Sequence, residues 1–190
     1  MPLPAPLPRE KLHTRTITCE GFRRHDGLWD VEAHIVDVKS FNLQIRQRGT
    51  IPAGEHLHEM WLRLTIDDDY VIQDIVASTE ASPWEYCQGA AANFARLKGI
   101  ALTSGFMSEV SKRLSRAEAC THIFELLRPL ATVAHQTIRN APKPDGTPQG
   151  GANPAMLDSC YAFASDGPIA KALWPEHTKE PEHAPAEVKP

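Results

Sequence analysis

The fold is organised around one stretch of sequence, Glu55-His-Leu-His-Glu-Met-Trp-Leu-Arg-Leu-Thr-Ile-Asp67. From Met60 to Ile66 every second residue is apolar, which is the pattern of a strand with one buried face. Continued back by the same period of two, this face takes in His58 and His56. The stretch therefore predicts a central strand with two imidazoles at the mouth of the core, in a spacing that suits metal ligands. The alternative is that one or both histidines form hydrogen bonds in a loop before the strand.

Further strands are predicted on both sides of this stretch. Gly27–Ile35 alternates apolar and polar residues, and a slip of the apolar pattern directly after it predicts a bulge. Asp67–Asp69 separates the central strand from a second apolar run, Tyr70–Ser78, which indicates an antiparallel hairpin. Together with the β-rich segment Thr14–Cys19, these runs predict a small antiparallel sheet of three to four strands.

The sequence period changes to that of helices after residue 82. Pro83 is predicted to start a helix with Ser82 as its cap, and a second short helix is predicted over Phe106–Leu114. Ser115-Arg-Ala-Glu118 has the pattern of a capping box, which predicts that a third helix starts there and continues through Thr137. The predicted fold class is therefore α+β, with the sheet covered on one face by about three helices.

Length and composition limit the classes of protein that this chain fits. Its 190 residues suffice for one domain, predicted over residues 13–175 between a disordered leader, 1–12, and a disordered tail, 176–190. A net charge of −4 gives no indication of a nucleic-acid or membrane partner, and no apolar run is long enough to span a bilayer. The four widely spaced cysteines are expected to be free thiols in the cytoplasm, and a homo-oligomer is compatible with the sequence.

The residues with the chemistry of metal ligands and acid/base groups form the first candidate site. They are His56, His58, Glu59, Cys87, Cys120, His122 and Glu125. Histidine and cysteine favour a divalent ion, zinc or iron, as the cofactor.

The spacing of the residues on the predicted helix limits which of them can bind the same ion. Two residues apart on a regular helix, Cys120 and His122 point about 200° apart, so either Cys120 lies in an irregular first turn or only one of them is a ligand. His122 and Glu125, three apart, share a helix face. The ordinary alternatives are that Cys120 is a small buried hydrophobe and that His122 is a core or surface histidine.

A second candidate lies on the predicted strand Gly27–Ile35, where Asp30, Glu32 and His34 share one face with Asp26 and Asp37 near by. Such a row suits a carboxylate metal site or acid/base chemistry, although it is more often the solvated face of a half-buried sheet. Phosphate-binding loops and nucleophile elbows are absent from the sequence. Nucleotide-dependent and serine-hydrolase functions are therefore disfavoured.

Three segments in the same order resemble the bacterial family catalogued as domain of unknown function 2889 (DUF2889). They are Gly27–Lys39, Gly54–Asp67 and Cys120–Leu126, and the resemblance spans roughly residues 14 to 175. It implies no defined activity, only an association with bacteria that degrade aromatic compounds.

A more distant similarity is to iron–sulfur scaffold proteins of the NifU/IscU type and to the SufE/NifU-like fold. It rests on the order of the central strand, Ile72-Gln-Asp74, Cys87, Lys98-Gly99 and Cys120-Thr-His122. The similarity implies a metal site where the central strand meets two helices. Departures from the scaffold pattern include the absence of a cysteine before the strand.

The function expected from these residues is a metal-dependent enzyme that acts on a small organic substrate by lyase or hydrolase chemistry, and the family association adds aromatic compounds to the substrates considered. His58, His122 and either Cys87 or Cys120 are expected to hold the ion, with Glu59 or Glu125 as general acid/base. The alternative class is a non-enzymatic metal or iron–sulfur carrier, and a third is a binding module without metal.

Overall fold

The computed structural model describes residues 3–143, 145–147 and 153–178. The chain divides into two compact units, Met1–Arg139 and Asn140–Pro190. The predicted single domain over residues 13–175 therefore spans parts of both units. The first unit contains the sheet and all the candidate metal ligands named from the sequence.

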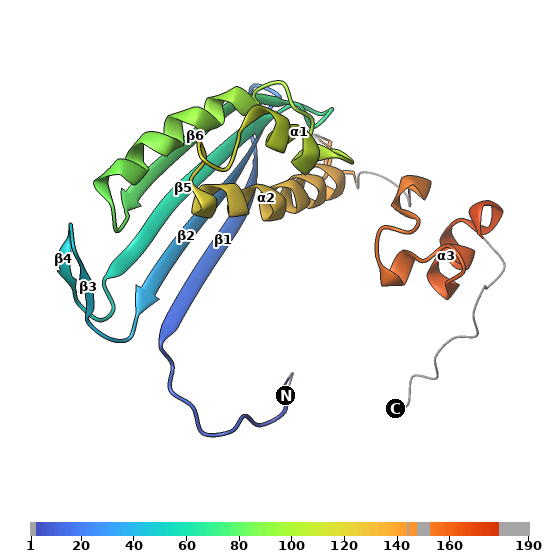
Figure 1. The fold of residues 1–190 in the computed structure, drawn as a ribbon. Helices are drawn as coiled ribbons and strands as arrows, with labels where there is room; N and C mark the ends of the chain where they lie inside the picture. Colours follow the sequence, from blue (N-terminus) through green and yellow to red (C-terminus); the bar gives the residue numbers. More distant parts are fainter. Residues whose placement is uncertain (1–2, 144, 148–152, 179–190) are drawn as a thin grey trace. The chain divides into compact units, whose positions relative to one another are not determined.

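Four antiparallel strands form the main sheet in the order β1-β2-β5-β6 (Figure 1). Their bounds are β1 His13–Arg23, β2 Trp29–Lys39, β5 His56–Ile66 and β6 Ile72–Ala81. A second, two-stranded sheet of β3 (Leu43–Ile45) and β4 (Gly49–Ile51) lies in the connection between β2 and β5. The predicted α+β class and the antiparallel sheet of three to four strands are confirmed.

Alternating side chains give the main sheet one buried face. In β2 the buried residues are Trp29, Val31, Ala33, Ile35 and Asp37, and the residues between them are half-buried. In β5 the same face carries Met60, Leu62, Leu64 and Ile66, as the sequence period predicted. The sheet therefore needs a covering layer on this face only, because the intervening residues remain in contact with solvent.

Three helical segments lie on one side of the sheet (Figure 1). They are the 3-10 helix η1 (Glu85–Leu97), α1 (Phe106–Arg113) and α2 (Thr121–Asn140). In α2 the buried residues recur at helical spacing and are Ile123, Leu126, Leu127, Leu130, Ala134 and Ile138. This apolar stripe packs the longest helix into the core.

Two predicted helix starts are wrong. The first helical segment begins at Glu85, and the Ser82 hydroxyl donates to the Trp84 carbonyl (2.8 Å) without capping a helix. The third helix begins at Thr121, six residues after the predicted Ser115 start. Between these two points the chain makes a separate turn, and the Glu118 carbonyl accepts a hydrogen bond from Asn93 Nδ2 (2.8 Å) instead of one from a residue of α2.

One of the two bonds of the capping box nevertheless forms, the one from the Ser115 backbone N–H to the Glu118 carboxylate. Ser115 donates to the Glu118 carboxylate from its backbone N–H (3.1 Å) and from its hydroxyl (2.7 Å). These bonds close a single turn, which Arg96 of η1 anchors through an ion pair with Glu118 (2.6 Å). The signal in the sequence was therefore genuine, but it marks an isolated turn before α2.

Short helices make up the described part of the second unit. They are η2 (Pro154–Met156), η3 (Tyr161–Phe163), α3 (Pro168–Leu173) and η4 (Pro175–His177). Phe163 and Trp174 pack edge to face, with ring centroids 5.5 Å apart. Of the predicted disordered tail, residues 179–190 lie outside the described residues, and of the predicted leader residues 3–12 are described and contain no helix or strand. Among the described residues, no helix has the length and apolar character required to cross a membrane.

The contact between β1 and α2 depends on Gly21. A Cβ at this position would overlap Thr137 Oγ1 and lie 2.8 Å from Thr137 Cβ and Cγ2. We expect Gly21→Ala to lower the free energy of unfolding by about 1–3 kcal/mol through overpacking. Chemical denaturation would measure the loss. Gly89→Ala is the matched control, because a Cβ there meets nothing within 4 Å, and equal losses in the two variants would contradict the prediction.

Candidate functional site

A row of charged and polar side chains crosses three strands at the end of the apolar core. Arg15 of β1 lies opposite Asp37 of β2, and Asp37 lies opposite His58 of β5. Each residue is therefore placed by strand register. Asp37 occupies the next inward position after Ile35 and is only 1% exposed.

Asp37 is bound through both carboxylate oxygens. Arg15 donates from Nε to Oδ1 and from Nη2 to Oδ2, both at 2.8 Å. His58 Nδ1 lies 3.0 Å from Oδ2, and His13 Nε2 lies 3.2 Å from Oδ1. The two hydrogen bonds from the Arg15 guanidinium therefore pair the buried charge.

Helix α2 adds two side chains above this row. His122 Nε2 lies 3.7 Å from Asp37 Oδ2, and its ring lies 3.8 Å from the His58 ring, centroid to centroid, with a tilt of 30°. Glu125 Oε2 accepts from Arg15 Nη1 at 2.6 Å. His122 and Glu125 share a helix face as predicted, because residues three apart are neighbours on a helix surface.

Asp37 was not among the residues predicted to join His58 and His122, although the sequence contained a signal for it. The apolar period of β2, carried two residues beyond Ile35, ends on Asp37, so the strand pattern alone placed a carboxylate on the buried face. The predicted bulge is not found in β2, where buried and half-buried residues alternate without a slip as far as Asp37. The register shift in the pairing with β5 falls between Asp37 and Val38, and the extra residue is Leu57 of β5.

Burial and charge shift the ionisation of these groups. Burial alone would raise the pKa of Asp37, but its hydrogen bonds with Arg15 and the nearby charges of Arg15 and His58 hold this pKa below the ordinary value. The hydrogen bond with Asp37 raises the pKa of Arg15 in turn. Burial lowers the pKa of His58, and His122 lowers it further; burial and then Arg15 lower the pKa of His122. Both imidazoles are therefore held in the neutral form.

Asp37, His58 and His122 form a candidate metal-binding group. Each offers one ligand atom, and these atoms all lie within 4.8 Å of one another. Two donors each about 2.1 Å from one ion are separated by about 3.0 Å at a bond angle of about 90° and by about 3.4 Å at about 109°. The distances of 3.0 Å and 3.7 Å from Asp37 Oδ2 to the two imidazoles are close to this range. Neutral imidazole is also the form that binds metal.

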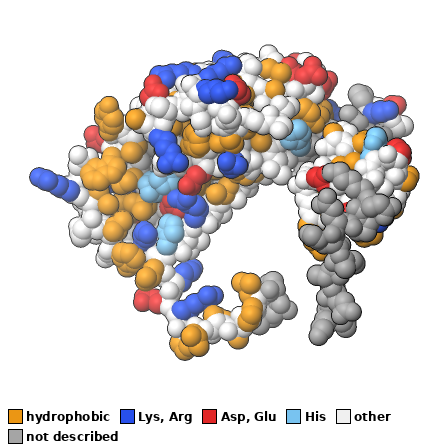
Figure 2. All heavy atoms as spheres, turned by 45° about the vertical axis from the view of Figure 1, so that its right-hand side comes forward, with side chains coloured by type: hydrophobic (Ala, Val, Ile, Leu, Met, Phe, Trp, Pro, Cys, Tyr) orange, Lys and Arg blue, Asp and Glu red, His pale blue; other side chains and the backbone are white. Residues whose placement is uncertain are grey.

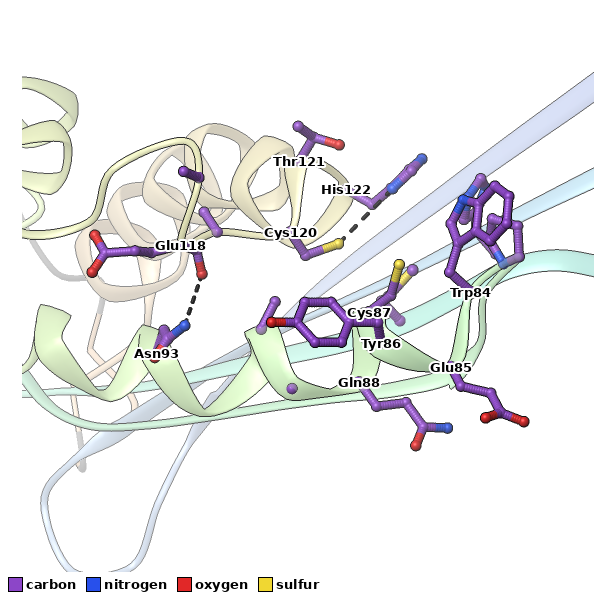
Figure 3. A pocket seen from close by; sticks show the side chains of 17 residues that line it. Trp84, Glu85, Tyr86, Cys87, Gln88, Asn93, Glu118, Cys120, Thr121 and His122 are labelled. Carbon is purple, nitrogen blue, oxygen red and sulfur yellow. Dashed lines mark hydrogen bonds between the residues drawn. The ribbon is translucent and has the colours of Figure 1, made fainter. Parts of the chain in front are cut away.

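A pocket of about 850 Å³ opens beside His58 and His122. Figure 3 shows Cys120 and His122 on one wall and Trp84, Tyr86 and Cys87 on the facing wall. Cys120 Sγ lies 3.9 Å from His122 Nδ1. Figure 2 shows histidine, acidic and basic side chains side by side on one face of the molecule, next to hydrophobic side chains.

The Cys120–His122 contact answers a question that helix spacing left open. Because α2 begins at Thr121, Cys120 lies before the regular helix, and the first of the two alternatives from the sequence is the one observed. His122 Nε2 is directed to Asp37 and Nδ1 to Cys120, so the two ring nitrogens have different partners. Cys87 lines the same pocket from η1.

Other candidates lie outside this cluster. His56 Nδ1 is 2.7 Å from Glu59 Oε2, and Glu59 Oε1 is 3.1 Å from His34 Nε2. Neighbouring positions of a strand face opposite sides, so Glu59 is directed away from the side of the sheet that carries His58. His34 stacks on Trp61, with centroids 3.7 Å apart. The structure therefore does not bring His56 or Glu59 to the Asp37 group.

The row Asp30, Glu32 and His34 lies on the half-exposed face of β2. Asp30 accepts from the Thr65 hydroxyl at 2.6 Å, and Glu32 pairs with Arg63 at 2.6 Å. These are cross-strand contacts of a solvated sheet face, which is the ordinary alternative that the sequence offered for this row.

Residues 13–136 match the model of the family described as Protein of unknown function (DUF2889), and the chain belongs to this family. The match covers the main sheet, η1, α1 and most of α2. These elements carry Asp37, His58 and His122, the three residues of the candidate metal-binding group. No curated protein and no solved structure matches the chain. The chemistry of the site must therefore be argued from its own residues.

The lowered histidine pKa values predict how stability depends on pH. The pKa of each of these histidines is lower in the folded chain than the ordinary value of 6.5. Their contribution to stability is therefore complete above pH 6.5. As the pH falls toward the pKa of the folded state, the unfolded chain binds more protons than the folded chain, and this contribution is lost. We expect the melting temperature in chelator-treated buffer to fall between about pH 7 and pH 5. His58→Gln and His122→Gln should make this decline shallower. The exposed His56→Gln is the control, and unchanged slopes in the first two variants would show that the imidazoles are not responsible.

Proposed function

We propose that this protein is a metal-dependent enzyme acting on a small organic substrate by hydrolase or lyase chemistry. The observation that carries the proposal is the convergence of Asp37, His58 and His122, from three elements far apart in the sequence, at the edge of a pocket of about 850 Å³. Pockets of this size accept small organic ligands.

Two imidazoles and one carboxylate are a donor set that suits zinc and iron(II), and these are the ions proposed. Arg15 pairs with Asp37 and would oppose a second cation there, but Glu125 partly offsets the Arg15 charge through its own ion pair. The bound ion supplies a Lewis acid for a carbonyl or hydroxyl oxygen of the substrate. Glu125 is the proposed acid/base carboxylate, because it lies beside Arg15 whereas Glu59 is directed away from the group.

A metal or iron–sulfur carrier is the second candidate function. The observation that favours it is the presence of Cys87, Cys120 and His122 around one pocket, since thiolates are the usual ligands of such clusters. For either function the proposed compartment is the cytoplasm, where the four free cysteines would stay reduced. The proposed partner is a small molecule, with no nucleic acid or membrane involved.

Replacement of His122 tests the proposed ion site. We expect about one zinc or iron ion per chain in protein purified without added metal, and less than about a tenth of this in His122→Ala. His122→Gln should lose nearly as much, because an amide binds these ions far less well than imidazole. Elemental analysis and thermal melts of both variants would be compared with His56→Ala, which should keep its ion.

The outcomes separate the candidate functions. Full occupancy in His122→Ala, or an ion content of the wild-type protein below about a tenth that added zinc or iron does not raise, would contradict the metal site. Inorganic sulfide and a visible charge-transfer spectrum would support the carrier. Turnover of a small ester, amide or hydroxy acid by the metal-loaded protein, lost both in His122→Ala and on removal of the ion with chelator, would support the metal-dependent enzyme.

A further inference from the structure

The proposed metal chemistry does not use the thiol on the pocket wall. Cys120 is buried, its Sγ lies 3.9 Å from His122 Nδ1, and both residues line the 850 Å³ pocket. The opposite nitrogen of the same ring, Nε2, lies 3.7 Å from Asp37 Oδ2. Thiol, imidazole and carboxylate therefore follow one another in the order of a nucleophile, its base and the group that orients the base.

We propose that Cys120, His122 and Asp37 form a nucleophilic triad that acts on carboxylic esters or thioesters with a small apolar acyl group. The triad goes beyond the proposed metal function, because it uses the imidazole of His122 as a proton carrier and needs no ion. Both distances are longer than those of a working hydrogen bond, as catalytic contacts often are before substrate is bound.

The surroundings of the triad fit this role. Arg15 holds Asp37 through two hydrogen bonds of 2.8 Å, so the carboxylate stays ionised and fixed in place. The His58 ring, 3.8 Å from His122, limits the rotation of the base. Trp84, 42% exposed, contributes apolar surface to the pocket, which suits an apolar acyl group.

The start of α2 supplies donors for the developing oxyanion. The backbone hydrogen bond from Phe124 N to the Cys120 carbonyl (2.9 Å) is the first of the helical i to i−4 series at this end. The N–H groups of the preceding helical residues therefore have no partner within the helix. Thr121, directly after Cys120, lies on the pocket wall. Such N–H groups beside a nucleophile are the usual components of an oxyanion hole.

The covalent step balances without a further reactant. The Cys120 thiol proton passes to His122 Nδ1 while Sγ bonds to the carbonyl carbon of the ester. The bond from this carbon to the leaving oxygen or sulfur then breaks, and the leaving group takes the proton from His122 or departs as an anion. Water hydrolyses the resulting thioester, which releases the acid and restores the thiol.

Acylation by p-nitrophenyl acetate tests the triad on the full chain after treatment with chelator, because an ion bound to His122 would occupy the imidazole; the untreated chain is measured beside it. We expect a burst of about one p-nitrophenolate per chain and an acetyl group on Cys120, formed about a hundredfold faster than on the exposed Cys160 of the same molecule. Mass spectrometry of peptides measures both sites at once, so Cys160 serves as an internal reference that needs no variant.

The variants isolate each member of the triad. Cys120→Ser should abolish the burst, and His122→Gln and Asp37→Asn should slow acetylation of Cys120 about tenfold or more without changing the rate at Cys160. Cys19→Ser is the matched control, since this half-buried thiol lies on β1 outside the pocket lining and should leave the burst intact. Acetylation of Cys120 no faster than that of Cys160, or a burst that survives in Cys120→Ser, would overturn the proposal.

The treatment with chelator keeps this test separate from that of the metal function. A burst that persists without metal supports the triad whatever the ion content of the protein. A burst that disappears with the metal, although Cys120 is present, would overturn the triad and leave the metal function standing.

Discussion

The burial of one carboxylate, that of Asp37, is the constraint on which the site depends. Removing a carboxylate from water costs on the order of several kcal/mol unless it is paired and fully hydrogen-bonded. Arg15 and His58 supply this pairing from the two neighbouring strands, so the cost is offset only when β1, β2 and β5 are in the observed register. Formation of the sheet and formation of the site are thus the same event.

Helix α2 couples the core to this row through residues three apart. Glu125 forms an ion pair with Arg15, and His122 lies beside Asp37 and lines the pocket. Near the other end of the helix, the bare backbone of Gly21 leaves room for Thr137. A change in how the helix packs on the sheet would therefore alter the distances from His122 to both of its partners, because interiors are close-packed and transmit such shifts.

The two proposals assign different work to the same imidazole. In the metal function, Nε2 of His122 and Asp37 share an ion, and Nδ1 keeps its proton toward Cys120. In the triad, Nδ1 accepts the thiol proton and Asp37 orients the ring. A neutral imidazole has one protonated nitrogen, so one molecule cannot serve both roles at the same moment. A bound ion would thereby suppress the reactivity of the thiol, which makes the two functions separable in solution.

Local patterns in the sequence determined the strands, the α+β class and the inward position of His58, because period two decides which side chains share a sheet face. The same rule, carried two residues further along β2, would have found Asp37. The pairing of Asp37 with Arg15 and His58 could not be predicted from the sequence, since strand register depends on pairing between distant segments. The meeting of Cys120 with His122 also required the tertiary structure. Helical spacing would separate two such residues, but α2 begins only at Thr121, after a break at which Asn93 donates to the Glu118 carbonyl, so Cys120 lies outside the regular helix.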